Sequence, residues 1–177
     1  MYIAMLRGIN VSGHKLVKME RLRAAFAGLG FTQVATYIQS GNVVFAAPTG
    51  TLPALTRKIE AQILRDFGFA VPVFLTTAAK LAEVIRQNPL VKDPAVEHDR
   101  LHVTFLSGEP PATARELLQP LAAAREQVRL VGQAIYLYCP AGYGNTKLAN
   151  AAIEKKLKVG ATTRNWKTVN TLLAMAQ

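Results

Sequence analysis

The order in which strand-like and helix-like patterns follow one another limits this chain to few folds. In its first part, compact apolar runs indicate strands, and apolar residues at helical spacing indicate helices. The expected strands are 2–9, 33–38, 42–46 and 71–76, and the expected helices begin at Met19 and cover 52–67. The two middle strands are joined by Gln39-Ser40-Gly41 and predict a hairpin. This β-α-β-β-α-β order is the ferredoxin-like, or split βαβ, arrangement.

The rest of the chain repeats most of this order after a connecting helix over 78–87 and an acidic loop. The expected elements are strands 101–106, 127–131 and 134–139, helices 112–124 and 147–158, and a final helix in which Trp166, Val169, Leu173 and Ala176 share a face. The closing strand is missing or reduced to Ala161-Thr162. We therefore predict an α+β chain with two ferredoxin-like lobes, the second incomplete, and a C-terminal helix. The expected domains are 1–77 and 101–177, joined by the helix and loop of 78–100.

Charge is unevenly spread along the 177 residues, whose formal net charge is +10. Residues 1–77 carry eight Lys and Arg against three Asp and Glu, residues 78–140 carry seven against seven, and residues 141–177 carry six against one. A hydrophobic content of 50% supports a buried core and excludes a disordered chain. If the fold joins the two basic ends, they form one surface for an anionic partner, possibly RNA or DNA; otherwise they are two solvated faces.

Cysteine content and the N-terminus indicate the compartment. The single cysteine, Cys139, lies in the apolar alternation AIYLYC, which excludes an internal disulfide and predicts a buried position in a strand. The first residues, MYIAMLRGI, have neither a basic leader nor a small-residue cleavage site, and no apolar run reaches the ~18 residues of a membrane span. We therefore expect a cytoplasmic protein with no membrane partner.

The segment 142–166 combines glycines, polar side chains and the only tryptophan of the chain. Its Gly-Tyr-Gly turn is expected to converge backbone N–H groups on an anion, ahead of a helix that opens at Asn145 or Thr146. Lys147 would then lie in the first turn, where the helix dipole disfavours a cation unless an anion is bound. The alternative is that an exposed lysine tolerates this small cost and that Glu154 and Lys158 form an ordinary i, i+4 pair.

A second cation is expected in the same kind of position. If Thr163 caps the final helix, Arg164 lies in the first turn of that helix, where it also needs an anion. Gly160 allows the chain to reverse between the two helices, so Lys147 and Arg164 can meet. This coincidence predicts an anion site shared by the two cations.

Several other sites are not supported by the sequence. The loop from Gly8 to Lys15 resembles a P-loop, but its lysine is displaced by one position and Leu16 stands where a hydroxyl is needed. The three histidines have no metal-ligand spacing with cysteines, so we expect no metal and no cofactor. No Gly-x-Ser-x-Gly elbow is present, and the strand at 41–45 lacks the basic and aromatic signature of an RNA-recognition module.

Three motifs resemble those of the bacterial family catalogued as domain of unknown function 1697. They are LRGINVSGHKLVKM (6–19), TYIQSGNVVF (36–45) and GYGNTKLANAAIEKKLKVGATTRNWKTV (142–169). The resemblance implies a two-lobed α+β fold and brings no assigned reaction. The residues at its motif positions are Arg7, Gly8, Asn10, Gly13, Lys18, Tyr37, Ser40, Gly41, Asn42, Tyr143, Gly144, Lys147, Asn150, Glu154, Lys155, Thr163, Arg164, Asn165 and Trp166.

The hypothesis that unites these features is a phosphate-bearing ligand, nucleic acid or nucleotide, held in a basic cleft between the lobes. The ligand-binding candidates are Arg7, Asn10, Lys18, Tyr37, Ser40, Asn42, Tyr143, Gly144, Lys147, Asn150, Arg164, Asn165 and Trp166. One alternative is an enzyme for a small phosphorylated or carboxylated metabolite, with Glu154 as acid or base beside Lys147. Another is a polar network that only stabilises the fold. A broad positive surface favours nucleic acid, a closed pocket favours the enzyme, and mutual pairing favours the network; the oligomeric state is left open.

Overall fold

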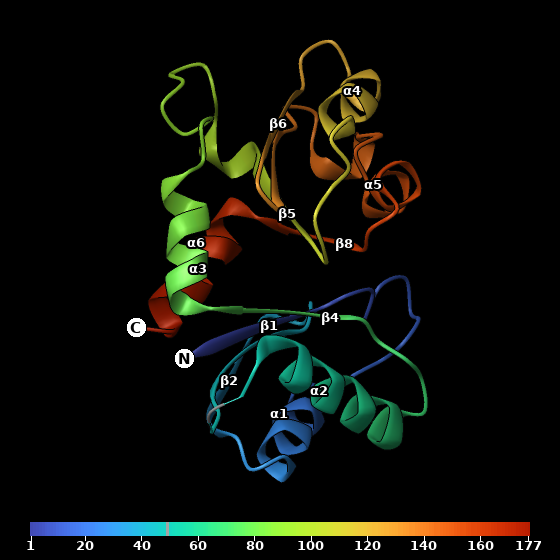
Figure 1. Ribbon diagram of the computed structural model, residues 1–177, viewed down its shortest axis with the longest axis vertical. Coiled ribbons are helices and arrows are strands. Elements are labelled where there is room, and N and C mark those ends of the chain that lie inside the picture. The colour runs from blue at the N-terminus through green and yellow to red at the C-terminus, as the bar shows by residue number, and fades with distance from the viewer. Residues whose placement is uncertain (49) are drawn as a thin grey trace. The chain divides into compact units, whose positions relative to one another are not determined.

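Two four-stranded antiparallel sheets organise the chain, each with its own helices (Figure 1). The computed structural model describes residues 1–48 and 50–177. The chain divides into two units, Met1–Ala82 with Thr171–Gln177, and Glu83–Asn170. It passes from one unit to the other within α3 (Ala78–Arg86) and again within α6 (Trp166–Met175).

The first unit has the complete β-α-β-β-α-β order. Its elements are β1 (Tyr2–Leu6), α1 (Met19–Gly28), β2 (Thr32–Tyr37), β3 (Asn42–Ala46), α2 (Leu52–Phe67) and β4 (Val73–Thr77). The strands lie in the order β2-β3-β1-β4, which is the ferredoxin-like order. Both helices cover one face of this sheet, and their buried residues include Leu22, Phe26 and Ile59.

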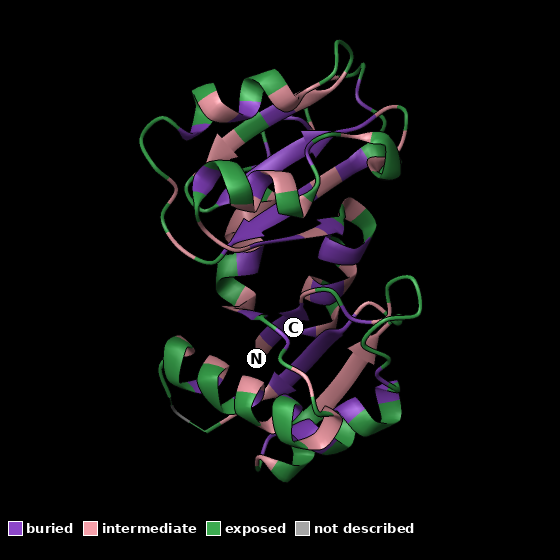
Figure 2. Ribbon diagram, turned by 90° about the vertical axis from the view of Figure 1, so that its right-hand side faces the viewer, coloured by how far each residue is buried: buried purple, intermediate pink, exposed green. Residues whose placement is uncertain are grey.

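The second unit has the same order. After a short 3-10 turn (His98–Arg100), its elements are β5 (Leu101–Leu106), α4 (Ala114–Leu118), a 3-10 turn (Gln119–Leu121), β6 (Gln127–Val131), β7 (Ala134–Tyr138), a 3-10 turn (Tyr143–Asn145), α5 (Asn150–Leu157) and β8 (Ala161–Asn165). The strand order β6-β7-β5-β8 matches that of the first sheet. Helices α4 and α5 cover one face, and Figure 2 shows buried strands beneath helices whose outer sides are exposed.

The expectation of an incomplete second lobe is wrong, because the closing strand β8 is present in full. It pairs with β5 from Leu106 opposite Ala161 to His102 opposite Asn165. The two β-branched threonines within the strand suit this extended conformation. Both lobes therefore have all six ferredoxin-like elements.

Two expected helix starts are also wrong. Helix α5 begins at Asn150 and not at Lys147, because the Thr146 hydroxyl accepts the Leu148 N–H at 3.0 Å and this local turn replaces the helical one. Thr163 does not cap the final helix; it lies in β8, and Asn165 Oδ1 instead accepts the Thr168 N–H at 2.8 Å. Neither expected cation therefore lies in a first helical turn.

Helix α4 is shorter than the expected 112–124. It ends at Leu118, because Pro120 has no backbone N–H to continue the helical hydrogen bonds, and the chain goes on as the 3-10 turn Gln119–Leu121. In the part of the chain that the structure describes, no helix is both long and apolar enough to cross a membrane.

Candidate functional site

In the second unit, polar side chains from four elements meet at the hydroxyl of Thr163 on β8. This hydroxyl donates to Asn150 Oδ1 at 2.7 Å, and it lies 2.7 Å from the Thr104 hydroxyl of β5. The Tyr143 hydroxyl donates to it at 3.1 Å. Thr104 and Thr163 are opposite each other in the sheet, so both side chains point to the face that α5 covers. We call Thr104, Tyr143, Asn150 and Thr163 the hydroxyl cluster.

His102 extends the hydroxyl cluster along the sheet. Its ring stacks on Tyr143 with centroids 4.9 Å apart, and its Nδ1 lies 3.2 Å from the Arg100 carbonyl oxygen. Burial lowers the pKa of His102, because the charged imidazolium loses solvation there. The ring is therefore favoured in its neutral form, and one face of Tyr143 is already occupied.

Glu154 on α5 is held by the start of the closing strand. Its Oε1 accepts the Ala161 N–H at 3.0 Å. Glu60 on α2 makes the same contact in the first unit, where its Oε1 accepts the Val73 N–H at 2.9 Å. Ala161 and Val73 are each the first residue of the closing strand, so both lobes join the second helix to this strand through one glutamate.

Four exposed lysines lie on and beside α5. Lys147 precedes the helix, Lys155 and Lys156 are in its last turn, and Lys158 follows it. In the part of the chain that the structure describes, none of the four forms an ion pair with a carboxylate. Lys158 adopts a left-handed conformation with φ of 59°. We call these four residues the lysine surface.

Arg164 is not on the same side of the sheet as the hydroxyl cluster. Because successive strand residues point to opposite faces, its side chain leaves β8 away from Thr163. It is 9% exposed, and its Nη1 donates to the Thr162 hydroxyl at 2.9 Å and to the Thr163 carbonyl at 2.8 Å. Lys147 lies in the loop before α5, and α5 covers the opposite face of the sheet from Arg164. The expected anion site shared by Lys147 and Arg164 assumed that both lie in first helical turns, and neither does.

The remaining candidates of the second unit have varied positions. Gly144 is exposed in the 3-10 turn beside Tyr143. Asn165 caps α6, and Trp166 is the half-buried first residue of that helix. The structure thus brings together Tyr143 and Asn150, and it gives Asn165 a capping role.

In the first unit, Asn10 fastens the loop after β1. Its Oδ1 accepts the Val17 N–H at 2.8 Å, while its Nδ2 donates to the carbonyls of Val17 and Gln39 at 3.0 and 2.8 Å. The residue has a positive φ of 54°, which asparagine tolerates better than most residues. Asn10 therefore joins the loop to the β2–β3 hairpin.

The hairpin candidates bond to one another. Asn42 is fully buried, and its Nδ2 donates to the Ser40 hydroxyl at 2.9 Å and to the Tyr37 carbonyl at 3.2 Å. Two cations lie on the same unit: Arg7, half-buried after β1, and Lys18, exposed at the N-cap of α1. The hydrogen bonds of Asn42 close the hairpin, and its side-chain amide finds both acceptors within it.

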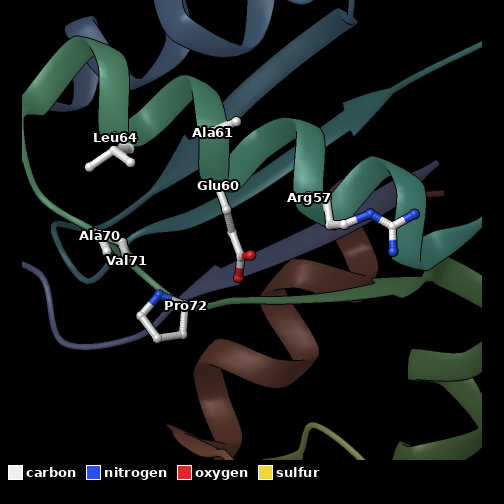
Figure 3. Close-up of a pocket in the computed structure, with 7 residues that line it drawn as sticks. All are labelled: Arg57, Glu60, Ala61, Leu64, Ala70, Val71 and Pro72. Carbon is white, nitrogen blue, oxygen red and sulfur yellow. The ribbon is translucent and has the colours of Figure 1, made fainter.

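Two pockets lie beside edge strands. One, of about 390 Å³, is lined by Arg57, Glu60, Ala61, Leu64, Ala70, Val71 and Pro72, and Figure 3 shows Glu60 reaching from α2 toward Pro72, the residue before β4. The other, of about 420 Å³, lies between α4 and β6. Neither pocket contains a predicted site residue.

Metal and thiol chemistry have no support in the described part of the chain. No group of three or more His, Cys, Asp or Glu side chains there could hold a metal ion. Cys139 is buried, and this burial raises the pKa of its thiol to about 11. The thiol is therefore protonated at neutral pH and is not an activated nucleophile.

Sequence reasoning missed His102 and Thr104 as partners of Tyr143 and Thr163. The alternation of His102, Thr104 and Leu106 along β5 places these side chains on one face. That alternation was a usable signal, but only the pairing with β8 shows which residues they meet.

The comparisons with known proteins agree with this fold. The chain is similar to the conserved bacterial protein SP0830 from Streptococcus pneumoniae, with a TM-score of 0.78, 22% identity, and coverage of 99% of this chain and 98% of that one. No curated protein matches. The family model described as "Protein of unknown function (DUF1697)" matches residues 1–136, a range that excludes the hydroxyl cluster except Thr104. Because this match covers most of the chain, the protein belongs to the DUF1697 family.

Proposed function

We propose that this protein binds the phosphate backbone of nucleic acid through the lysine surface beside α5. The observation that carries the proposal is that these lysine side chains are exposed and that no described carboxylate is paired with them. Lys147, Lys155, Lys156 and Lys158 are exposed and have no ion-pair partner among the described residues. Glu154, the only acidic residue of 141–177, accepts a backbone N–H. Release of counterions from a bound polyanion favours association with such a surface.

The conformation of Lys158 adds support. A left-handed residue other than glycine costs roughly 1–2 kcal/mol in conformational energy, and glycine is the usual residue at this position after a helix. Lys158 is present there with φ of 59°. The lysine surface therefore includes a charged side chain at a position where glycine would be less strained.

The two other hypotheses explain different residues. The polar-network hypothesis accounts for four residues whose side chains hydrogen-bond within the chain: Asn10, Asn42, Asn150 and Thr163. We assign these residues to stabilising the fold. The acid–base enzyme is less well supported, because Glu154 Oε1 already accepts the Ala161 N–H at 3.0 Å and so joins α5 to the closing strand. The lysine surface is explained by neither alternative.

The test is a titration of fluorescent single-stranded RNA and DNA of about twelve nucleotides at several salt concentrations. We expect affinity to fall steeply with salt, with a slope of roughly 0.7 in log affinity per log salt for each phosphate contacted. The paired variant Lys155→Ala with Lys158→Ala should bind more weakly and have a shallower slope. The control pair Lys80→Ala with Lys92→Ala removes the same charge from exposed lysines elsewhere.

A further variant separates binding from stability. Lys158→Gly relieves the left-handed strain, partly offset by the flexibility of glycine in the unfolded chain. We expect its free energy of unfolding to stay equal or rise by up to about 1 kcal/mol while RNA affinity falls. Equal losses of affinity in the two lysine pairs, or affinity that does not depend on salt, would contradict the proposal.

A further inference from the structure

Strand β6 is an exposed edge of the second sheet, and its pairing shows which backbone groups face outward. Among the described strands it pairs only with β7, and the two-residue turn after Val131 makes Val131 and Ala134 a hydrogen-bonded pair. Hydrogen-bonded pairs alternate along an antiparallel ladder, so the N–H and C=O groups of Val128 and Leu130 point away from β7. The edge therefore offers two outward donors and two outward acceptors.

Arginine side chains occupy the acceptors of this edge. Arg115 of α4 donates to the Leu130 carbonyl at 3.3 Å, and Arg129 donates to the Val128 carbonyl at 2.9 Å. No acceptor for the Val128 and Leu130 N–H groups exists among the described residues. A partner strand would supply those acceptors and would take over the carbonyls.

The edge lies in a groove with an apolar floor. The residues that line the pocket of about 420 Å³ include Leu118 of α4, Val128 and Leu130 of β6, and Pro89. Leu118 is 1% exposed and Val128 is 5% exposed, so the floor belongs to the packed core. The groove can take apolar side chains at alternate positions of an added strand.

Charge selects the partner. Arg115 and Arg129 form no ion pair with any described carboxylate. Of two acids beside the strand, Glu126 accepts the Ala123 N–H at 2.9 Å, and Asp93 accepts from Gln127 Nε2 at 3.4 Å. Arg129 leaves the strand on the face opposite to Val128 and Leu130, whereas Arg115 comes from α4, which covers their face. Adjacent carboxylates of an extended peptide also point to opposite faces, so each can reach one arginine.

We propose that the β6 edge binds an extended acidic peptide, which adds a strand to the second sheet. Its carbonyls accept the Val128 and Leu130 N–H groups, and two neighbouring carboxylates draw Arg115 and Arg129 off the strand carbonyls. Without a peptide, the two arginines cover the edge and oppose pairing between copies of the chain. This surface is separate from the lysine surface and does not depend on nucleic-acid binding.

The test uses the ¹⁵N-labelled full chain and the capped peptide acetyl-Thr-Val-Glu-Glu-Val-Thr-amide. The readout is hydrogen exchange at the Val128 and Leu130 amides. With the peptide at about ten times its dissociation constant, exchange at these amides should slow about tenfold. The matched peptide with two lysines in place of the glutamates should leave exchange unchanged.

Substitutions locate the contact. Arg115→Gln together with Arg129→Gln should abolish the slowing, whereas Arg125→Gln, at an exposed arginine outside the groove, should preserve it. Amide spectra of each variant establish that it is folded. Equal slowing by the lysine peptide, no slowing by either peptide, or equal loss in Arg125→Gln would overturn the proposal. Slowing of the same amides by single-stranded RNA would assign the groove to nucleic acid instead.

Discussion

At the scale of single residues, two glycines with the same backbone angle offer a controlled comparison. Gly41 and Gly13 both have φ of 76°. A Cβ on Gly41 would lie 2.7 Å from Leu6 Cβ and from Ile9 Cδ1, whereas a Cβ on Gly13 would meet nothing within 4 Å. Both alanine substitutions therefore strain the backbone, but only Gly41→Ala also overpacks the core.

We predict that Gly41→Ala lowers the free energy of unfolding by about 1–3 kcal/mol more than Gly13→Ala does. Each variant should also lose about 1 kcal/mol from the left-handed conformation. Urea unfolding of both variants and the parent measures the difference. Equal losses would show that the hairpin turn moves aside at little cost, contrary to this explanation.

His102 makes stability depend on pH in a defined direction. Its pKa in the folded protein is lowered from 6.5 by burial. As the pH falls through 6.5, the unfolded chain binds a proton that the folded chain does not, so stability is lost on acidification and is fully present above that value. We predict that His102→Gln makes the decline in urea midpoint between about pH 7 and pH 5 shallower than in the parent. Parallel declines would refute this.

At the scale of elements, the two glutamates that join the second helix to the closing strand are equivalent. Glu60 bonds to the Val73 N–H, and Glu154 bonds to the Ala161 N–H. A hydrogen bond from a backbone N–H to a carboxylate contributes roughly 1.5–3 kcal/mol. The contact explains how a short helix such as α5 is held to β8.

We predict that Glu154→Ala accelerates hydrogen exchange at the Ala161 amide and leaves the Val73 amide unchanged. Glu60→Ala should have the reverse effect, so each variant is the control for the other. If Glu154 served only as an acid or base, its removal would leave Ala161 protected to the same degree as in the parent.

Element boundaries were predictable where local pattern decides them. The expected bounds 52–67, 101–106 and 127–131 are those of α2, β5 and β6. Each element combines a period of apolar residues with a turn signal at its end, such as Gly68 after α2. The sequence pattern did not predict the start of α5, because the hydrogen bond from the Leu148 N–H to the Thr146 hydroxyl competes with the first helical turn.

At the scale of the whole molecule, we predict that no metal ion purifies with the protein in stoichiometric amount. The physical reason is that no cluster of ligand side chains forms within residues 1–48 and 50–177. Elemental analysis after dialysis is the measurement, and unfolding with and without a chelator is its control. One equivalent of zinc or iron, or a lower unfolding temperature in the chelator, would contradict the prediction.

The candidate site was only partly predictable from the sequence. The unpaired lysines were visible as an excess of cations in 141–177. The bonded roles of Asn10 and Asn150 were not visible, because their partners lie in other elements. A polar residue in a loop has the same local pattern whether it binds a ligand or fastens the fold.

The sequence by itself determined the two lobes, because alternation and helical spacing are properties of neighbouring residues. Only the tertiary structure decided how Thr163 and Arg164 are used. Once β8 pairs with β5, adjacent side chains must point to opposite faces, so Thr163 joins the hydroxyl cluster and Arg164 does not. That pairing joins residues far apart in the chain, and its register depends on contacts that no local pattern contains.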